Sequence, residues 1–248
     1  MSLLKYTSMA CLALTLGACQ SLFQPNMHAP LETKRDAWEH IKPGCTTPDC
    51  PLFNLDVVHF PSEPDLEPIV ERRLLQLTRT HQDAPLPVSL KAYENTFLSQ
   101  SPAHYGSYLQ SKVREQHDGL VIIEVSSYLD VGTEHGTPGR GFINWSRQQH
   151  KVLTLQDMLV PGQEATFWQA AAEAHRGWQS TNGLASDPKF VKDWPFKQTP
   201  HIALTAGGVI LKYDVETIAP YALGQPEIKI DYLRLNGVLK PALFPGRG

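Results

Sequence analysis

The segment LVIIEVSSYLDV, residues 120–131, has the clearest β-strand pattern in this chain. Its first half is almost continuously apolar, which is typical of a strand that is buried on both faces. We therefore expect residues 120–131 to lie at the centre of a sheet. The segment GTEHGTPGRG, residues 132–141, follows, and FINW, residues 142–145, resumes the strand pattern. Four glycines and a proline within ten residues predict a loop between the two strands rather than regular structure.

The chain beyond residue 145 mixes helices with short strands. Residues 155–159 predict a short helix that Thr154 caps, and residues 164–178 predict a longer amphipathic helix. The pair Gly207-Gly208 suits a tight hairpin turn. Three strands are expected around this turn and after it, at residues 201–206, 209–215 and 227–233.

The chain before residue 120 predicts one strand and two helices. Residues 52–60 are strand-like, and residues 66–81 have apolar side chains at helical spacing, with Asp65 as the N-cap. A second helix is expected at residues 89–98, with a helical pattern that resumes toward Val113. The mixture lacks a regular βαβ alternation, so we predict an α+β fold with an antiparallel or mixed sheet and packed helices.

Four stretches of the chain form a pattern that occurs in a known family. They are Tyr128 with residues 132–141, residues 142–145, residues 151–159, and residues 208–213 running into 217–227. Together they resemble the RsiV-like domain family. In that family a strand ending in an aromatic residue leads to a Gly-Gly-Ala-His-Gly-type loop, and Glu134 stands here where members commonly have a small residue. A Lys-x-Leu-Thr-Leu-x-Asp segment follows, and the family ending resembles Ile-Ala-Pro-Tyr-Ala-x-Gly-x-Pro-Glu.

The resemblance implies a range of roles. The best-understood member type is the extracellular part of a membrane anti-sigma factor that binds lysozyme, and other members lie beside a polysaccharide deacetylase domain. It implies an RsiV-like domain at residues 91–240, preceded by an accessory subdomain at residues 45–90. A histidine-containing loop at this place makes Glu134, His135 and Arg140 the expected binding residues.

The N-terminus is typical of an export signal. Lys5 precedes a short apolar stretch, and residues 1–18 are too short to span a bilayer as a stable helix. The ending Leu-Gly-Ala-Cys resembles a bacterial lipobox, which implies cleavage before Cys19 and lipid on that residue. The alternative is an ordinary signal with a stray cysteine. Gln20 follows the cysteine, so the lipoprotein sorting pattern implies the outer membrane, facing the periplasm or the cell surface.

The charge of the chain is mildly negative. The sequence holds 22 basic and 25 acidic side chains, a formal net charge of −3 at pH 7, and no basic patch stands out. Nucleic acid is therefore not an expected partner. The polar residues 19–44 are interpreted as a tether, with a short helix around residues 36–41.

Two cysteines remain besides Cys19 and the signal's own Cys11. Cys45 and Cys50 lie close together, and in an oxidising compartment such a pair usually forms a disulfide, here near the N-terminus of the folded region. The alternative is a metal site completed by His40 or His59 (a structural zinc site requires four ligands). No cofactor and no metal are expected.

Three further features contain residue types that occur in catalytic or ligand-binding sites. His135 beside Glu134 has the chemistry of a general base or a ligand, while the surrounding glycines also suit a simple turn or a recognition loop. Ser186 and Lys189 have the Ser-x-x-Lys spacing, but Pro188 lies inside it. Four tryptophans form either a sugar-stacking platform or part of the core; they are Trp145, Trp168, Trp178 and Trp194.

These observations favour a lipid-anchored binding protein of the bacterial cell envelope that is not an enzyme. Its expected contacts are the membrane, through Cys19, and a protein partner, which is lysozyme or another cell-wall-acting protein. Two alternatives stay open. One is an envelope assembly or structural lipoprotein with a different partner, and the other is a cell-wall hydrolase or deacetylase-related enzyme.

Overall fold

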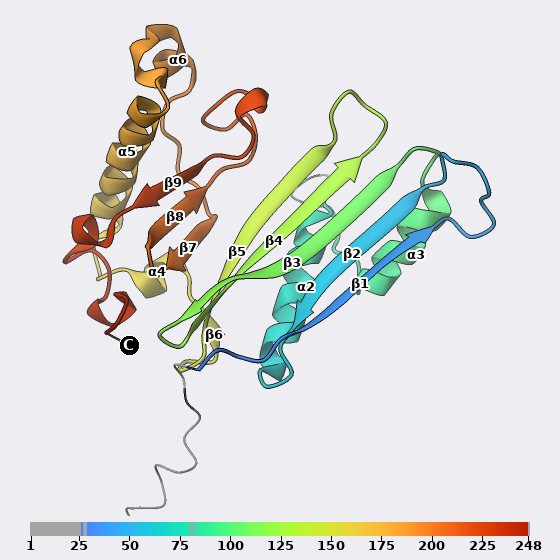
Figure 1. The fold of residues 1–248 in the computed structure, drawn as a ribbon, viewed down its shortest axis with the longest axis horizontal. Helices are drawn as coiled ribbons and strands as arrows, with labels where there is room; N and C mark the ends of the chain where they lie inside the picture. The colour runs from blue at the N-terminus through green and yellow to red at the C-terminus, as the bar shows by residue number, and fades with distance from the viewer. Residues whose placement is uncertain (1–25, 27–28, 80, 82, 248) are drawn as a thin grey trace, which may run out of the picture.

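The computed structural model describes residues 26, 29–79, 81 and 83–247, and it contains two β-sheets with helices packed on them (Figure 1). The strands of the first sheet are β1 (Lys34–Ile41), β2 (Leu52–His59), β3 (Gly106–His117), β4 (Leu120–Asp130), β5 (Thr137–Ser146) and β6 (Lys151–Val152). Those of the second sheet are β7 (Ile202–Thr205), β8 (Gly208–Lys212) and β9 (Glu227–Ile230). The helices are α2 (Glu67–Leu77), α3 (Leu90–Gln100), α4 (Leu155–Met158), α5 (Glu164–Thr181) and α6 (Pro188–Asp193). Short 3₁₀ helices are η1 (Pro64–Leu66), η2 (Leu184–Ser186), η3 (Tyr221–Leu223), η4 (Tyr232–Leu235) and η5 (Pro241–Leu243).

The strands of each sheet lie in sequence order. β2 and β3 are parallel, and all other neighbouring pairs of strands are antiparallel. The predicted α+β fold with a mixed sheet is therefore confirmed. Residues 45–90 contribute β2 and α2 to the same sheet and core that later residues complete.

Strand β4 lies between β3 and β5, as its apolar sequence predicted. Val121 and Ile123 face the core beneath α2 and α3, while Leu120 and Ile122 face the second sheet. All four side chains are buried because each face of this part of the strand has its own cover. Beyond Glu124 this strand lacks the second cover, and the residues on its uncovered face, Ser126 and Tyr128, carry hydroxyl groups.

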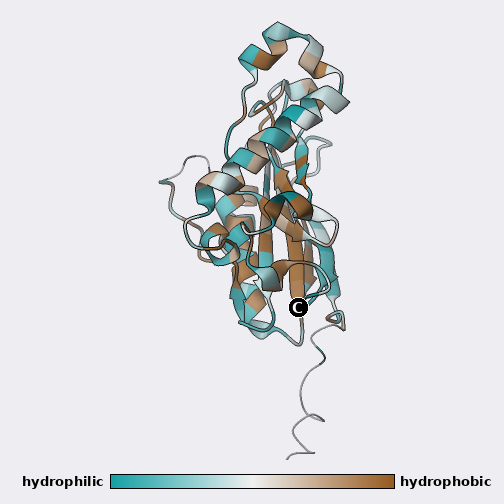
Figure 2. Cartoon of the chain, turned by 90° about the vertical axis from the view of Figure 1, so that its left-hand side faces the viewer, coloured by the Kyte–Doolittle hydropathy of each residue, from teal (hydrophilic) through white to brown (hydrophobic). Residues whose placement is uncertain are grey.

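The three-stranded sheet lies between the first sheet and α5 (Figure 1). Figure 2 shows α5, of mixed hydropathy, crossing strands that are coloured apolar. Phe167 and Ala171 of α5 are fully buried against these strands, with Trp168 and Trp178 partly buried beside them. The amphipathic helix predicted at residues 164–178 is confirmed and extends to Thr181.

Asn144 of β5 joins the two sheets. Its Nδ2 donates to the carbonyl oxygen of Ile202 (2.7 Å), and its Oδ1 accepts from the backbone N–H of Leu204 (2.8 Å). The side chain is buried, with an exposed fraction of 3%. The side-chain amide of Asn144 therefore forms hydrogen bonds with the free edge of β7, in the place that the backbone of a neighbouring strand would take.

Local capping explains where the helices start. The Ser89 side chain accepts from the N–H of Ala92 at the start of α3. Thr154 and Asp157 form a reciprocal capping box at α4, which confirms the predicted cap. The predicted cap at Asp65 is wrong, because that residue lies inside η1 and α2 has no side-chain cap.

Two predicted helical segments are strands. The short helix expected at residues 36–41 is part of β1, which pairs with β2 along its whole length, so folded structure extends into the expected tether. The helical pattern expected toward Val113 is part of β3. β1 is paired with β2, and β3 is paired with β2 and β4, and this pairing overrides weak local propensity.

The loop predicted at residues 132–141 is correct only for its first half. Strand β5 already begins at Thr137, so the glycines at 139 and 141 lie within a sheet. A Cβ at Gly139 would lie 2.6 Å from the Ser127 hydroxyl and 3.4 Å from Leu77 of α2. Glycine here permits a close approach of strand and helix, and it does not mark a break in the strand.

Candidate functional site

The tip of the β4–β5 hairpin is ordered by local hydrogen bonds. The N–H of Gly132 donates to Asp130 Oδ1 (2.9 Å), and the Thr133 hydroxyl donates to the His135 carbonyl (2.8 Å). The N–H of Gly136 donates to the Tyr128 hydroxyl (3.1 Å). Glu134 and His135 are exposed at this tip. The tip is therefore an ordered turn, and two of the expected binding residues, Glu134 and His135, are exposed to solvent on it.

His135 lies against a residue that the sequence did not single out. Its ring stacks on Tyr221, with 4.5 Å between ring centroids and 15° between planes. Tyr221 begins η3, in the segment that connects β8 to β9. From the sequence, residues 220–226, with two prolines and a glycine, are interpreted as a rigid connection that positions the last strand, although the family ending includes them. The fold thus brings together two segments that are about 85 residues apart in sequence, and Leu223 adds an apolar side chain that is 47% exposed.

Arg140 lies on β5, away from the tip. It is half-buried opposite Ser126 and lines a cavity of about 250 Å³. Tyr128 connects the two places, because its hydroxyl binds the tip while its ring lines the same cavity. The structure therefore places Glu134 and His135 on the tip and Arg140 on the sheet face. The other cavity residues are Asn54, Asp56, Tyr108, Leu109, Gln110, Ser126 and Ser127.

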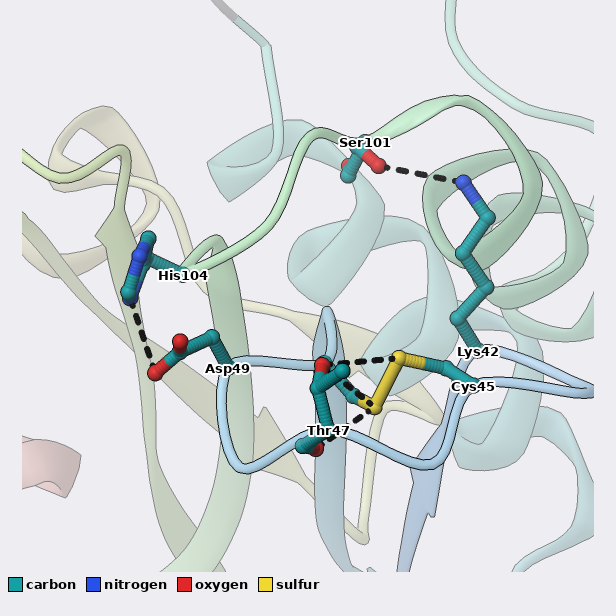
Figure 3. Close-up of a disulfide and its surroundings, with 7 residues drawn as sticks. Lys42, Cys45, Thr47, Asp49, Ser101 and His104 are labelled. Carbon is teal, nitrogen blue, oxygen red and sulfur yellow. Dashed lines mark hydrogen bonds and ion pairs between the residues drawn. A yellow bond between two sulfur atoms is a disulfide. The ribbon is translucent and has the colours of Figure 1, made fainter.

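The disulfide between Cys45 and Cys50 is confirmed, with 5.8 Å between the Cα atoms (Figure 3). The metal alternative is wrong for this pair, because the two sulfurs are bonded to each other. His40 Nδ1 instead lies 2.5 Å from Glu94, and His59 Nδ1 lies 2.8 Å from Glu67.

The disulfide loop meets the hairpin tip at one end of the first sheet. The N–H of His104 donates to the Asp49 carbonyl (2.8 Å), which ties the loop to the segment before β3. The side chains of the same two residues also pair, with 3.3 Å between His104 Nδ1 and Asp49 Oδ1 (Figure 3). A cavity of about 600 Å³ is lined by Cys50 of the disulfide loop together with Gly132 and Thr133 of the tip. Two features that are distant in sequence therefore share one surface.

An ion cluster around the buried side chains of Glu124 and Lys212 connects the two sheets. Lys212 Nζ of β8 lies 2.7 Å from Glu124 Oε1 and 2.9 Å from Glu227 Oε1. Arg114 completes the cluster, with 2.9 Å to Glu227 and 3.5 Å to Glu124. The sequence does not reveal this ion cluster, because its members come from four different strands.

The cluster holds Glu124 in its ionised form. Burial favours the neutral acid, but the hydrogen bond and charge of Lys212, helped by Lys112 and Arg114, outweigh it. The net result is that the pKa of Glu124 lies below its usual value of 4.5.

The remaining candidates do not assemble into a site. Trp145 is 1% exposed and belongs to the core. The Ser186 hydroxyl donates to the Gly183 carbonyl (3.0 Å), and Lys189 pairs with Asp193, so the Ser-x-x-Lys pair is not brought together. The described part of the chain contains no group of three or more His, Cys, Asp or Glu side chains placed to hold a metal ion. Nor does any described helix have the length and apolar character needed to cross a membrane.

Comparison with known proteins identifies the family. A DUF3298 family protein from Pseudomonas aeruginosa PAO1, solved as a crystal structure, is 60% identical, with a TM-score of 0.86. The match covers 90% of this chain and 100% of that one. The chain belongs to the DUF3298 family. DUF3298 is the RsiV-like domain family, so the resemblance seen in the sequence is confirmed.

Two further comparisons agree with this assignment. The family described as "Protein of unknown function (DUF3298)" matches residues 156–232, within the expected domain at residues 91–240. A DUF3298 member from Bacteroides fragilis NCTC 9343 shares the fold at 16% identity and a TM-score of 0.67, covering 88% of this chain and 96% of that one. A search of curated proteins found no match.

The ion cluster predicts how stability depends on pH in this DUF3298 protein. Lys212→Met should lower the free energy of unfolding by about 3–5 kcal/mol at pH 7, because it leaves Glu124 buried without its main partner. In the wild type the low pKa of Glu124 stabilises the fold above pH 4.5, and this contribution is lost as the pH falls through the folded-state pKa. In Lys212→Met, burial raises the pKa of Glu124. Glu124 therefore takes up a proton at low pH, and the cost of burying its charge without Lys212 disappears.

Urea denaturation at pH 7 and pH 5 measures the effect. The difference in the free energy of unfolding between wild type and Lys212→Met should be smaller at pH 5 than at pH 7. Lys229→Met, which removes a lysine paired with Asp231 on the exposed side of β9, is the matched control and should change stability by less than about 1 kcal/mol. A gap of equal size at both pH values would contradict the assigned role of Glu124.

Proposed function

We propose that this DUF3298 protein is a lipid-anchored, non-catalytic binding protein of the bacterial cell envelope, and that its partner is lysozyme or another cell-wall-acting protein. The observation that carries the proposal is the exposed hairpin tip stacked on Tyr221. The family resemblance adds the class of partner, because the best-understood member type binds lysozyme.

The arrangement of the tip supports a recognition role. Glu134 and His135 project from a turn that several hydrogen bonds fix, and Tyr221 supports the His135 ring from the second sheet. A surface that is ordered before binding loses less conformational freedom when a partner arrives. The tip also offers a carboxylate, an imidazole and the apolar Leu223, a mixture that suits a protein surface.

The lipid anchor is proposed from the sequence. Residues 1–18 and Cys19 lie outside the described residues, so the support for this part is the lipobox pattern. Acyl chains contribute about 0.8 kcal/mol for each buried CH₂ group, and more than one chain gives stable attachment. Gln20 supports the outer membrane as the destination.

Replacing Glu134 and His135 together with alanine should weaken lysozyme binding at least tenfold. The melting temperature should change by only a few degrees, because both side chains are exposed at the tip. Calorimetric titration of the purified protein with lysozyme, alongside thermal denaturation, measures both quantities. Arg176→Ala, on the exposed surface of α5, is the control that should leave binding unchanged.

Three outcomes would count against this assignment. Unchanged binding and stability would remove these residues from the interface. A large fall in melting temperature would show that the turn mainly serves folding. No binding by the wild type would favour an envelope lipoprotein with a different partner.

Cys19→Ala should abolish membrane attachment and leave a soluble form or an uncleaved precursor, because the lipid acceptor is gone. Cell fractionation followed by mass spectrometry of the N-terminus tests this, with Cys11→Ala as the control that should still be lipidated. Gln20→Asp should shift the protein toward the inner membrane in a Gram-negative host. A correctly processed Cys19→Ala protein in the outer membrane fraction would refute the anchor.

A further inference from the structure

The face of the first sheet that points away from α2 and α3 is only partly covered. The second sheet covers it as far as Glu124 and Phe142, and beyond these residues the strands are open toward the viewer of Figure 1. Tyr108 of β3 and Tyr128 of β4 are paired residues on this open part. Their side chains are 40% and 38% exposed, and their ring centroids are 6.1 Å apart. Two neighbouring strands therefore present adjacent aromatic rings to solvent.

Each ring lies against a glycine. A Cβ placed on Gly106 would come within 2.9 Å of the Tyr108 ring, and one on Gly136 would come within 2.4 Å of the Tyr128 ring. The Tyr128 hydroxyl is also held by the N–H of Gly136. The two tyrosine rings thus pack directly on the glycine backbone, which holds them in place. Because they are already ordered, they lose less conformational entropy when they bind a ligand.

Tyr108 lines two cavities on this face. One holds about 250 Å³ and reaches Arg140, and the other holds about 600 Å³ and reaches the disulfide loop. The larger volume falls within the range of roughly 300–1,000 Å³ that ligand sites commonly occupy. Tyr108 is the residue common to both linings, so the two cavities lie next to each other at this side chain.

Fixed polar groups surround the rings. Asp56 accepts from Arg35 Nε (2.6 Å) and from Gln110 Nε2 (2.7 Å), and Asn54 Nδ2 donates to Glu39 (3.2 Å). The hydrogen bond to Arg35 lowers the pKa of Asp56, so this carboxylate stays an acceptor. Arg140 adds a guanidinium with five N–H donors, of which one bonds to Gly139 within the described contacts.

We propose that this open face binds a neutral glycan strand, which passes over Tyr108 and Tyr128 and hydrogen-bonds to Asn54, Gln110 and Arg140. A pyranose ring has an apolar C–H face that packs on the π face of an aromatic side chain, and hydroxyls at its rim that both donate and accept. The open face offers both kinds of contact in one groove. The proposal goes beyond the protein partner assigned to the hairpin tip and does not depend on it.

The charge of the lining favours a neutral ligand over a polyanion. Three carboxylates line the two cavities (Asp49, Asp56 and Asp130), against the guanidinium of Arg140 and that of Arg35, which pairs with Asp56. A phosphate-rich chain would meet more negative than positive charge here, whereas binding of nucleic acid requires basic groups along its backbone. A glycan without charges meets no such penalty.

Calorimetric titration of the full-length protein with two hexasaccharides tests the proposal, in a detergent that has no sugar headgroup. One probe is the N-acetylglucosamine hexamer and the other is cellohexaose. The wild type should bind at least one of them, and Tyr108→Ala should weaken that binding at least tenfold. Tyr108→Phe keeps the ring and should retain most of the affinity. Trp38→Ala is the matched control, because this aromatic residue is 36% exposed but lies opposite Leu55, on the other face of the sheet.

The outcomes separate this proposal from the proposed function. Tyr108→Ala should still bind lysozyme as the wild type does, since Tyr108 lies outside the hairpin tip. No binding of either hexasaccharide by the wild type would overturn the glycan site, whatever the lysozyme result. Equal weakening by Tyr108→Ala and Trp38→Ala would also overturn it, because the effect would not come from the open face.

Discussion

The packing of the second sheet on the first depends on how the backbone N–H and C=O groups at the free edge of β7 find hydrogen-bond partners. An edge strand presents unpaired N–H and C=O groups, and each such group left buried without a partner costs about 1–3 kcal/mol. Here side chains of the first sheet take the place of a neighbouring strand. Asn144 binds Ile202 and Leu204, and the Leu204 carbonyl also accepts from His117 Nε2 (2.8 Å). The N–H of Ala206 donates to Glu115 Oε2 (3.2 Å).

This edge fixes the second sheet relative to the first, and the ion cluster around Lys212 fixes it again farther along the strands. The segment between β8 and β9 is thereby held near the β4–β5 hairpin. The stacking of His135 on Tyr221 is a consequence of that placement. The same geometry leaves the far half of β4 uncovered, because the second sheet ends its contact near Glu124. The polar contacts between the two sheets therefore set the position of Tyr221 beside the hairpin tip, and they also set how much of the first sheet stays uncovered.

Much of the fold could be predicted because its signals are local. The apolar run at residues 120–131 indicated a central strand, Thr154 indicated the start of a helix, and Cys45 with Cys50 indicated a disulfide. The two wrong helices, at residues 36–41 and toward Val113, have a common cause, because pairing within the sheet decides the conformation of both segments. β1 is an edge strand of charged residues that becomes a strand only through β2, and no periodicity in its own sequence reveals this.

The candidate site was partly predictable for the same reason. The glycine-rich turn pointed to Glu134 and His135, and the resemblance to the family included the segment that contains Tyr221. Nothing in the sequence places Tyr108 beside Tyr128, because the register of β3 on β4 decides that contact. The sequence also grouped Arg140 with the tip, whereas the early start of β5 carries it onto the sheet face.

Amide hydrogen exchange at Leu204 tests most directly whether side chains of one sheet satisfy the edge of the other. The bond from the Leu204 N–H to Asn144 should make this edge-strand amide exchange slowly, and Asn144→Ala should make it exchange rapidly while the amides inside β4 stay protected. NMR measures both residue by residue. Exchange at Leu204 in the wild type as fast as at the outer edge of β1, or protection unchanged in Asn144→Ala, would contradict the account.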